Sequence, residues 1–545
     1  MPSNQRQLQD LVAAIAVLQF PNCGGVVNKA IVVGAVLLVA IHIAAQERHF
    51  DGKSLWRHVE ILAADDLEGR GTGTAGLERA EAYVVEQVKK AGLTPAGVNG
   101  FFQPVSIARR EIADCSAGLV REGRVEPLVL AEEAACTTFV DVAAKVEAPL
   151  VFLGYGTQVP EKGYDDFAGL DLKGKIAVTI PGSPEGIDGP LARHYAARRW
   201  DQFRKAGLVG WVFITGPNGR WPSLAANVVE PRLHLTGELD ETHDEQIMMY
   251  FNPAHADKLF DGTGHTAAEL FGLARDRKPL PHFVLPATLR ATARTVNTAV
   301  ATSNVVAKLE GSDPRLRNEY VVFSAHIDHL GIGEPVNGDR IYNGAVDNAS
   351  GVAALLDIMA ELKREGVRPK RSVLFTFFTA EEHGLLGSKY FVAHPTVDLK
   401  AIVANLNIDQ IHAIVPLKAM RVIGIDESDL GDAARRAAGS QGIAAEAETE
   451  LNPNAFTANS DHANFVFAGI PAVALKVGFP GELSALLEAY RQSPYHTPFD
   501  DTRQPVNLET FAKFEEVARA LLLDVANARR RPEWKSTSFY ARYAK

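Results

Sequence analysis

The sequence predicts an α/β fold, in which helices flank a mixed, largely parallel sheet and a small β-rich domain is inserted between two parts of the chain. From Asn304 onward, short apolar runs alternate with helical patterns, which is the order of strands and crossover helices in a parallel sheet. Between about residues 135 and 290 the pattern changes to short β-type runs punctuated by proline and glycine. A chain of 545 residues, of which 46% are hydrophobic, is long enough to form both cores.

The amino-terminal segment carries an apolar run of 16 residues, 30–45, directly after Lys29. This run is short for a membrane span, which needs about 20 residues, and it is typical of the hydrophobic region of a signal peptide. Because almost thirty residues precede it, a start at Val27 would give a more ordinary leader. We expect residues 1–45 to be a signal peptide, with an uncleaved anchor or a buried core helix as alternatives. Export would place the remaining chain in the periplasm or outside the cell.

Residues 46–134 are predicted to form the first part of the main domain. Ala82, Val85 and Val88 have helical spacing within residues 77–91, and Gly92 supplies the stop. The predicted insertion, residues 135–291, contains strands at 149–155, 175–180 and 209–214 and a helical stretch at 191–206.

Residues 292–545 are predicted to form the second part of the main domain and to carry the site. This part contains several continuous apolar runs, which are typical of strands that are buried on both faces of a sheet. In such sheets the ligand site lies beyond the carboxyl ends of the strands. The predicted strands are 320–325, 373–378 and 401–408, and the predicted helices are 352–362, before Gly366, and 385–392.

Composition and charge exclude several classes of function. The chain has 56 lysines and arginines against 66 aspartates and glutamates, a net charge of −10, so it has no bulk attraction for nucleic acid. A mean hydropathy of −0.04 excludes a protein with many membrane spans. The three cysteines, Cys23, Cys115 and Cys136, have no C-x-x-C spacing, so a thiolate zinc site is not expected. Whether Cys115 and Cys136 form a disulfide stays open, because it depends on export and on geometry.

Histidines and carboxylates follow three successive predicted strands. Because the carboxyl ends of parallel strands meet at one edge of the sheet, these side chains should converge there. Asp347 begins the intervening helix at the same edge, and His496 comes from a late loop. The residues that follow the strands are His326, Asp328 and His329, then Glu381 and Glu382, and then Asp409.

Crowded carboxylates repel one another and become protonated unless positive charge compensates them. No lysine or arginine adjoins these residues in the sequence, so a divalent metal is the simplest compensation. Histidine and carboxylate ligands suit zinc at a hydrolytic site, and two Zn²⁺ balance Asp347, Glu382 and Asp409 better than one.

Each of these residues also has a simpler structural interpretation when it is taken alone. A His-x-Asp pair is commonly structural, a Glu-Glu pair commonly begins a helix where the dipole favours acids, and an Asp-Asn pair commonly caps a helix. Their joint occurrence at consecutive strand ends favours a site.

The motifs resemble peptidase family M28, which includes di-zinc aminopeptidases. The strings HIDHLG, DNASGVAALL, FTAEEHGLLGS, NLNIDQ and YHTPFDD occur in the family's order, and 21, 35 and 27 residues separate His326, Asp347, Glu382 and Asp409. The likeness covers residues 50–133 and 292–525, and the block between them resembles a protease-associated domain.

The resemblance implies a role for each matching residue. Asp347 would bridge two Zn²⁺ ions, and Glu381 would be the general base. Asp328 would orient His326, while Tyr495 and Asp461 are weaker candidates for polarising the substrate carbonyl and for outer support. The remaining ligands would be His326 and Asp409 at one metal, and Glu382 and His496 at the other.

We therefore expect a secreted or periplasmic di-zinc exopeptidase that hydrolyses amino-terminal peptide bonds of peptides or proteins through a metal-bridging hydroxide. The alternatives are a related carboxypeptidase, a glutaminyl cyclase or a non-catalytic binding protein. No nucleic-acid partner is expected, and the sequence does not define the oligomeric state or the side-chain preference. Core packing is favoured over a substrate pocket for the aromatic residues Phe456, Phe465, Phe467, Phe479 and Tyr490.

Overall fold

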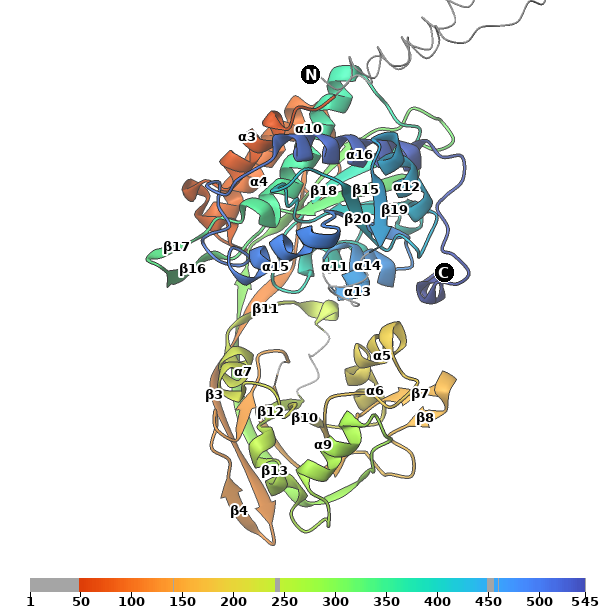
Figure 1. The fold of residues 1–545 in the computed structure, drawn as a ribbon. Coiled ribbons are helices and arrows are strands. Elements are labelled where there is room, and N and C mark those ends of the chain that lie inside the picture. Colours follow the sequence, from red (N-terminus) through yellow and green to blue (C-terminus); the bar gives the residue numbers. More distant parts are fainter. Residues whose placement is uncertain (1–48, 141, 241–245, 448–454, 459, 545) are drawn as a thin grey trace, which may run out of the picture. The chain divides into compact units, whose positions relative to one another are not determined.

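A mixed, nine-stranded sheet lies at the centre of the main domain (Figure 1). The computed structural model describes residues 49–140, 142–240, 246–447, 455–458 and 460–544, so the predicted leader, residues 1–45, lies outside the described residues. The strand order is β1 (Thr94–Pro95), β14 (Ser303–Leu309), β18 (Ser372–Phe378), β15 (Tyr320–His326), β19 (Ile402–Ile408), β22 (Ala472–Val477), β20 (Ala419–Ile423) and β21 (Ala444–Ala447), and β2 (Phe102–Pro104) pairs with β14.

The four central strands of this sheet, β18, β15, β19 and β22, are parallel to one another. At the two sides, β14 runs antiparallel to β18, and β20 runs antiparallel to β22. The prediction of an α/β fold with a mixed, largely parallel sheet is confirmed. Because the central strands share one direction, their carboxyl ends meet at one edge of the sheet.

Helices cover both faces of this sheet (Figure 1). Side chains of β15 alternate between two cores: Val321 and Phe323 pack in one and Val322 packs in the other, all fully buried. The first core contains helices α3 (Lys53–Leu62), α4 (Ala75–Lys90), α10 (Ser350–Glu365), α12 (Leu430–Ser440) and α16 (Leu508–Asn527). The second contains α11 (Leu386–Ala393), α13 (Ala455–Ala458) and α14 (His462–Phe467).

The buried face of α4 differs from the predicted one by one residue. Ala82, predicted on the apolar face, is exposed, whereas Glu81 is buried. The buried stripe runs instead through Leu77, Ala80, Val84 and Val88, which keeps the helical spacing of three and four residues.

A second nine-stranded sheet with its own core is built from residues between Ile107 and Val300. Its first long strand, β3, pairs antiparallel with β13, and the predicted insertion boundaries at residues 135 and 291 lie inside this sheet. The predicted helical stretch 191–206 is two helices, α5 (Gly189–Ala196) and α6 (Arg199–Lys205). The strand order is β11 (Arg232–Leu235), β3 (Ile107–Arg121), β13 (Phe283–Val300), β6 (Lys145–Phe152), β9 (Ile176–Thr179), β10 (Gly210–Ile214), β12 (Ile247–Phe251) and β5 (Ala134–Cys136), and β4 (Arg124–Pro127) pairs with β3.

A disulfide joins Cys115 of β3 to Cys136 of β5, with the two Cα atoms 6.7 Å apart. These strands stand near opposite ends of the strand order, so the bond links two sides of the second sheet. It closes a loop with a sequence separation of 21 residues.

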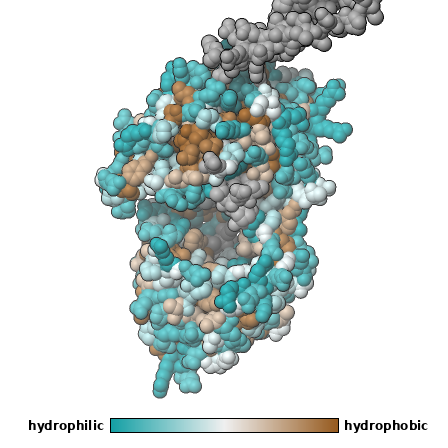
Figure 2. All heavy atoms as spheres, viewed as in Figure 1, coloured by the Kyte–Doolittle hydropathy of each residue, from teal (hydrophilic) through white to brown (hydrophobic). Residues whose placement is uncertain are grey.

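The apolar residues of the described chain are gathered mainly in these cores. The face of the molecule in Figure 2 is mostly hydrophilic, with smaller areas of apolar side chains. Within the described residues, the structure contains no helix with the length and apolar character of a membrane span.

Candidate metal centre

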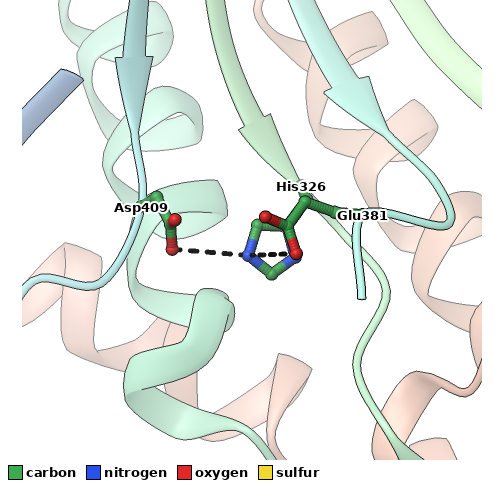
Figure 3. Close-up of side chains that lie close together, drawn as sticks. All are labelled: His326, Glu381 and Asp409. Carbon is green, nitrogen blue, oxygen red and sulfur yellow. Dashed lines mark ion pairs between the residues drawn. The ribbon is translucent and has the colours of Figure 1, made fainter. Parts of the chain in front are cut away.

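The carboxyl ends of three neighbouring parallel strands bring the first group of side chains together. His326 ends β15, Glu381 follows β18, and Asp409 follows β19. In Figure 3 the dashed lines from the two carboxylates meet at one nitrogen of the His326 imidazole. His326 Nε2 lies 3.4 Å from Asp409 Oδ1 and 3.9 Å from Glu381 Oε2. The sequence-based expectation that these strand ends converge is therefore met in the structure.

A second group lies beside the first and shares Asp347 with it. Asp347 Oδ1 is 3.2 Å from His326 Nε2, while its other oxygen, Oδ2, is 3.3 Å from His496 Nε2. His496 Nε2 is also 3.2 Å from Glu382 Oε2. The two oxygens of Asp347 thus face the two groups, which is the position that a bridging ligand needs.

The backbone around Asp347 is fixed by hydrogen bonds from a distant loop. The Asp500 carboxylate accepts the N–H groups of Val346 and Asp347 at 2.9 and 3.0 Å. Gln410 Nε2 donates to Asp347 Oδ2 at 3.0 Å. These contacts hold the irregular turn before α10, so that both carboxylate oxygens point into the site.

The start of α10 is packed tightly against the end of β19. A Cβ atom on Gly351 would lie 2.3 Å from Asn348 Oδ1 and 2.7 Å from the carbonyl oxygen of Ile408. Asn348 Nδ2 donates to that carbonyl, and its Oδ1 accepts from the N–H of Gly351. Glycine at position 351 lets the helix approach closely enough for the Asn348 side chain to join the turn to the strand.

Asp328 differs in its contacts from the sequence-based expectation. His326 Nδ1 is 3.1 Å from the backbone carbonyl oxygen of Asp328, while the Asp328 carboxylate is 3.9 Å away. The carboxylate instead accepts the backbone N–H of Glu381 at 3.0 Å and the hydroxyl of Thr72 at 3.0 Å. Asp328 therefore orients His326 through its backbone and positions the Glu381–Glu382 segment through its side chain.

No role was predicted for His329 of the HIDHLG motif, and the structure places its side chain beside Glu382 in the site. Its Nδ1 lies 2.6 Å from Glu382 Oε1, and its ring packs perpendicular to that of His496, with centroids 5.8 Å apart. His329 is fully buried, and its Nε2 has no hydrogen-bond partner. The only sequence signal was its place in HIDHLG, three residues after His326.

Arg70 is a second residue that sequence reasoning missed. The guanidinium is 1% exposed and donates to four backbone carbonyl oxygens, those of Leu62, Ile327, Asn343 and Gly344. Burial lowers the pKa of Arg70 to about 10, partly offset by nearby carboxylates, so the group remains charged at neutral pH. It joins the end of α3 to the two loops that carry the metal-centre residues.

The remaining predicted residues, Tyr495 and Asp461, also lie close to the site. The Tyr495 ring stacks on His496 with centroids 3.8 Å apart, and burial together with the surrounding acids raises the pKa of its hydroxyl, which keeps the proton. Asp461 is fully buried, and burial raises its pKa to about 7.

The electrostatics of the site call for additional positive charge. Burial raises the pKa of Glu381 well above its usual range, and the charges of Asp409 and Glu382 raise it further. Burial alone would lower the pKa of His326, but Glu381, Asp347 and Asp409 raise it well above its ordinary value. Both shifts arise because several buried carboxylates are crowded together with little positive charge around them.

The donor set fits metal ions at two positions. Each of two groups brings its possible ligand atoms within 4.8 Å of one another: His326 with Glu381 and Asp409, and His329 with Asp347 and Glu382. Asp409 Oδ1 and His496 Nε2 are buried without a hydrogen-bond partner, so both atoms have the lone pair that a metal ligand needs. These groups include Glu381 and His329, so the geometry alone does not separate the predicted base from the predicted ligands.

The aromatic residues considered for a pocket are mostly core residues. Phe456 and Phe465 pack in the core with α14, and Phe479 packs in the core with α10 and α16. Tyr490 is 4% exposed, whereas Phe467 is 39% exposed.

Comparisons with known proteins agree with the motifs. Residues 304–522 match the family described as peptidase family M28. Leupeptin-inactivating enzyme 1 of Streptomyces exfoliatus is 31% identical over 189 residues, covering 34% of this chain and 39% of that protein. The probable leucine aminopeptidase 2 of Aspergillus oryzae is 34% identical over 191 residues, covering 34% of this chain and 35% of that protein. The match thus spans little more than a third of the length of these relatives.

A solved structure supports the fold over most of the chain. The aminopeptidase from Aneurinibacillus sp. strain AM-1 superposes with a TM-score of 0.53 at 20% sequence identity, covering 89% of this chain and 96% of that one. At this identity the likeness concerns the fold alone.

Proposed function

We propose that this chain, whose residues 304–522 match peptidase family M28, is a zinc-dependent exopeptidase of that family that hydrolyses amino-terminal peptide bonds. The observation that carries the proposal is the position of Asp347, whose two carboxylate oxygens face His326 on one side and His496 on the other. Relatives named leucine aminopeptidase and leupeptin-inactivating enzyme support a peptide substrate.

Two zinc ions would be held around this shared carboxylate. His326 and Asp409 would hold one ion, and Glu382 and His496 would hold the other, with Asp347 between them. Bound zinc lowers the pKa of water towards neutrality and polarises the scissile carbonyl. A site of histidine and carboxylate donors suits zinc, whereas calcium and magnesium prefer sites in which all ligands are oxygen atoms.

Glu381 is the proposed general base. Its backbone N–H is held by Asp328, and its carboxylate reaches to 3.9 Å from His326 Nε2, at the same edge of the sheet as the ligands. From there it would take a proton from the attacking water and pass it to the leaving amine. The Tyr495 ring stacks on His496, and its hydroxyl, which keeps its proton, would donate a hydrogen bond to the developing oxyanion.

The same proposal includes export of the protein. The disulfide between Cys115 and Cys136 favours an oxidising compartment, because such bonds are rare in the cytosol. The apolar run at residues 30–45, outside the described residues, would be the export signal or an anchor. The second sheet would be the protease-associated insertion that the sequence suggests.

The proposal is tested with the purified full-length protein. Zinc content is measured per chain, and release of chromogenic amines is followed from amino-terminal amides before and after chelation. The matched controls are the same amides with an acetylated amino terminus. About two zinc ions per chain and chelator-sensitive hydrolysis of the free-amine substrates would support the proposal. Protein without bound zinc, or hydrolysis limited to blocked substrates, would contradict it.

A further inference from the structure

A lysine lies at the edge of the metal centre and has no role in the proposed chemistry. Lys476 is near the end of β22, beside β19, and its Nζ is 3.9 Å from Asp409 Oδ2. Its side chain is 17% exposed, so the ammonium group is neither buried in the core nor fully in solvent. Within the described part of the chain, Asp409 is its one ion-pair partner.

In the proposed function, on which this inference rests, the partner Asp409 is a zinc ligand. A carboxylate that coordinates zinc shares its charge with the ion, so it no longer neutralises a neighbouring ammonium group. Lys476 then lies beside the metal centre without a carboxylate that neutralises its charge. An unneutralised, partly desolvated cation favours a negatively charged ligand.

Two arginines add positive charge around Lys476. Arg421 is paired directly with Lys476 across the antiparallel strands β20 and β22, so their side chains project from the same face of the sheet. Arg491 is exposed near the end of α15 (Ser484–Gln492). No ion pair of Arg491 is present among the described residues.

His412 connects these cations to the site through a row of rings. It is 4% exposed and stacks perpendicular to Tyr490 with centroids 4.5 Å apart, while Tyr490 lies 6.3 Å from Tyr495, which covers His496. Arg491 directly follows Tyr490 on α15, and burial together with the charges of Lys476 and Arg491 lowers the pKa of His412 to about 3. These rings lead from His496 in the metal centre to His412, near Lys476 and Arg491.

We infer that Lys476, with Arg421 and Arg491 around it, forms a subsite for a carboxylate group of the substrate next to the scissile bond. Two sources have this chemistry: the side chain of an amino-terminal glutamate or aspartate, and the free α-carboxylate of a short peptide. An ammonium–carboxylate contact in a partly desolvated site is a charge-assisted hydrogen bond, which contributes more than a neutral one.

The inference is tested with the zinc-loaded full chain and substrate pairs that differ only in charge. The glutamyl and glutaminyl anilides differ in the side chain, and Leu-Gly and Leu-glycinamide differ in the α-carboxylate. The variants are Lys476→Met and Lys476→Gln, with Lys513→Met as the control. Lys513 lies on α16, where its side chain is 37% exposed and pairs with Glu509, so this control makes the same change of charge elsewhere.

The wild type should favour the charged member of at least one pair in kcat/KM. The Lys476 variants should reduce that preference by about 10-fold to 100-fold, the range for loss of a hydrogen bond to a charged group. The substrate pair whose preference falls in the Lys476 variants identifies the source of the carboxylate. Equal kcat/KM within both pairs in the wild type, or a preference that persists in both Lys476 variants, would overturn the inference.

Failure of the proposed function gives a different result. If the wild type hydrolyses no substrate, the exopeptidase assignment fails, and calorimetric binding then decides the role of Lys476. Glutamate binding tighter than glutamine binding in the wild type but not in Lys476→Met would support a carboxylate subsite. Equal binding of the two amino acids to the wild type would refute it.

Discussion

Arg70 gives the sharpest test of how the metal centre is supported. Its guanidinium donates at 2.5 and 2.6 Å to the carbonyl oxygens of Leu62 and Asn343, and at 3.0 and 2.9 Å to those of Ile327 and Gly344. Ile327 follows the ligand His326, and Gly344 begins the turn that carries Asp347. Replacement by methionine keeps much of the side-chain volume but leaves these buried carbonyls without a donor.

The expected loss follows from the number of unpaired carbonyls. Each buried acceptor left without a partner costs about 1 kcal/mol at the low end of the usual range, so four cost about 4 kcal/mol. Removing the guanidinium also removes the cost of burying its charge, so we expect Arg70→Met to lower the free energy of unfolding by about 3 kcal/mol. Arg70→Lys keeps the charge but loses the planar fork, and should fall near Arg70→Met if hydrogen bonding is the main contribution.

The measurement is urea-induced unfolding of the metal-free protein, followed by circular dichroism. Arg79→Met is the matched control, because Arg79 is 44% exposed and pairs with Glu68 at the surface, where such pairs contribute about 0–1 kcal/mol. An Arg70→Met variant as stable as the Arg79→Met variant would refute the reasoning. A stable Arg70→Lys beside an unstable Arg70→Met would assign the effect to charge instead of hydrogen bonding.

Three further predictions concern the site and the core. Glu381→Gln should retain both zinc ions by metal analysis yet lose about 10²–10⁴-fold in kcat, because it removes the base alone; loss of zinc would instead make Glu381 a ligand. Asp328→Asn should weaken zinc about 10-fold to 100-fold in a chelator competition, since Asp328 holds the Glu381–Glu382 backbone; unchanged affinity would count against this support. Burial, with Asp357 nearby, raises the pKa of Glu515 well above its usual range. The stability that the protonated form contributes is therefore complete below the ordinary glutamate pKa and is lost as pH rises through the folded-state pKa. Glu515→Gln should flatten this decline of stability with rising pH in urea unfolding, and identical pH profiles of the two proteins would contradict the prediction.

The elements that position the site could be predicted from the sequence because their signals are local. The run Tyr320–Ala325 predicted a strand over 320–325, and the structure has β15 at Tyr320–His326. Gly366 was predicted to end a helix, and it has φ of 67° directly after α10. Since His326 and Asp409 lie at the ends of such strands, their convergence followed from the parallel arrangement.

The supporting residues could not be predicted, because their partners are defined by tertiary structure. Arg70 ends the short 3-10 helix Asp65–Arg70, 256 residues before His326, and its partners are backbone carbonyls, which no residue type in the sequence identifies. Lys476 occupies one position in an otherwise apolar strand, and only the pairing of β22 with β19 brings it to Asp409. The extent of the second sheet was missed for the same reason, since the pairing of β3 with β13 joins residues that are more than 160 positions apart in the sequence.

The arrangement of charge explains how several carboxylates can be held close together in one buried site. The buried Arg70 guanidinium donates to four backbone carbonyl oxygens beside the site and not to the carboxylates in it. The carboxylates thus keep oxygens that are free of hydrogen bonds, such as Asp409 Oδ1. A lysine or arginine in their place would relieve the repulsion but would also occupy the ligand positions. Because Arg70 supports the loops through their backbone, it holds the acids in place without occupying their oxygens, which remain available to a divalent cation.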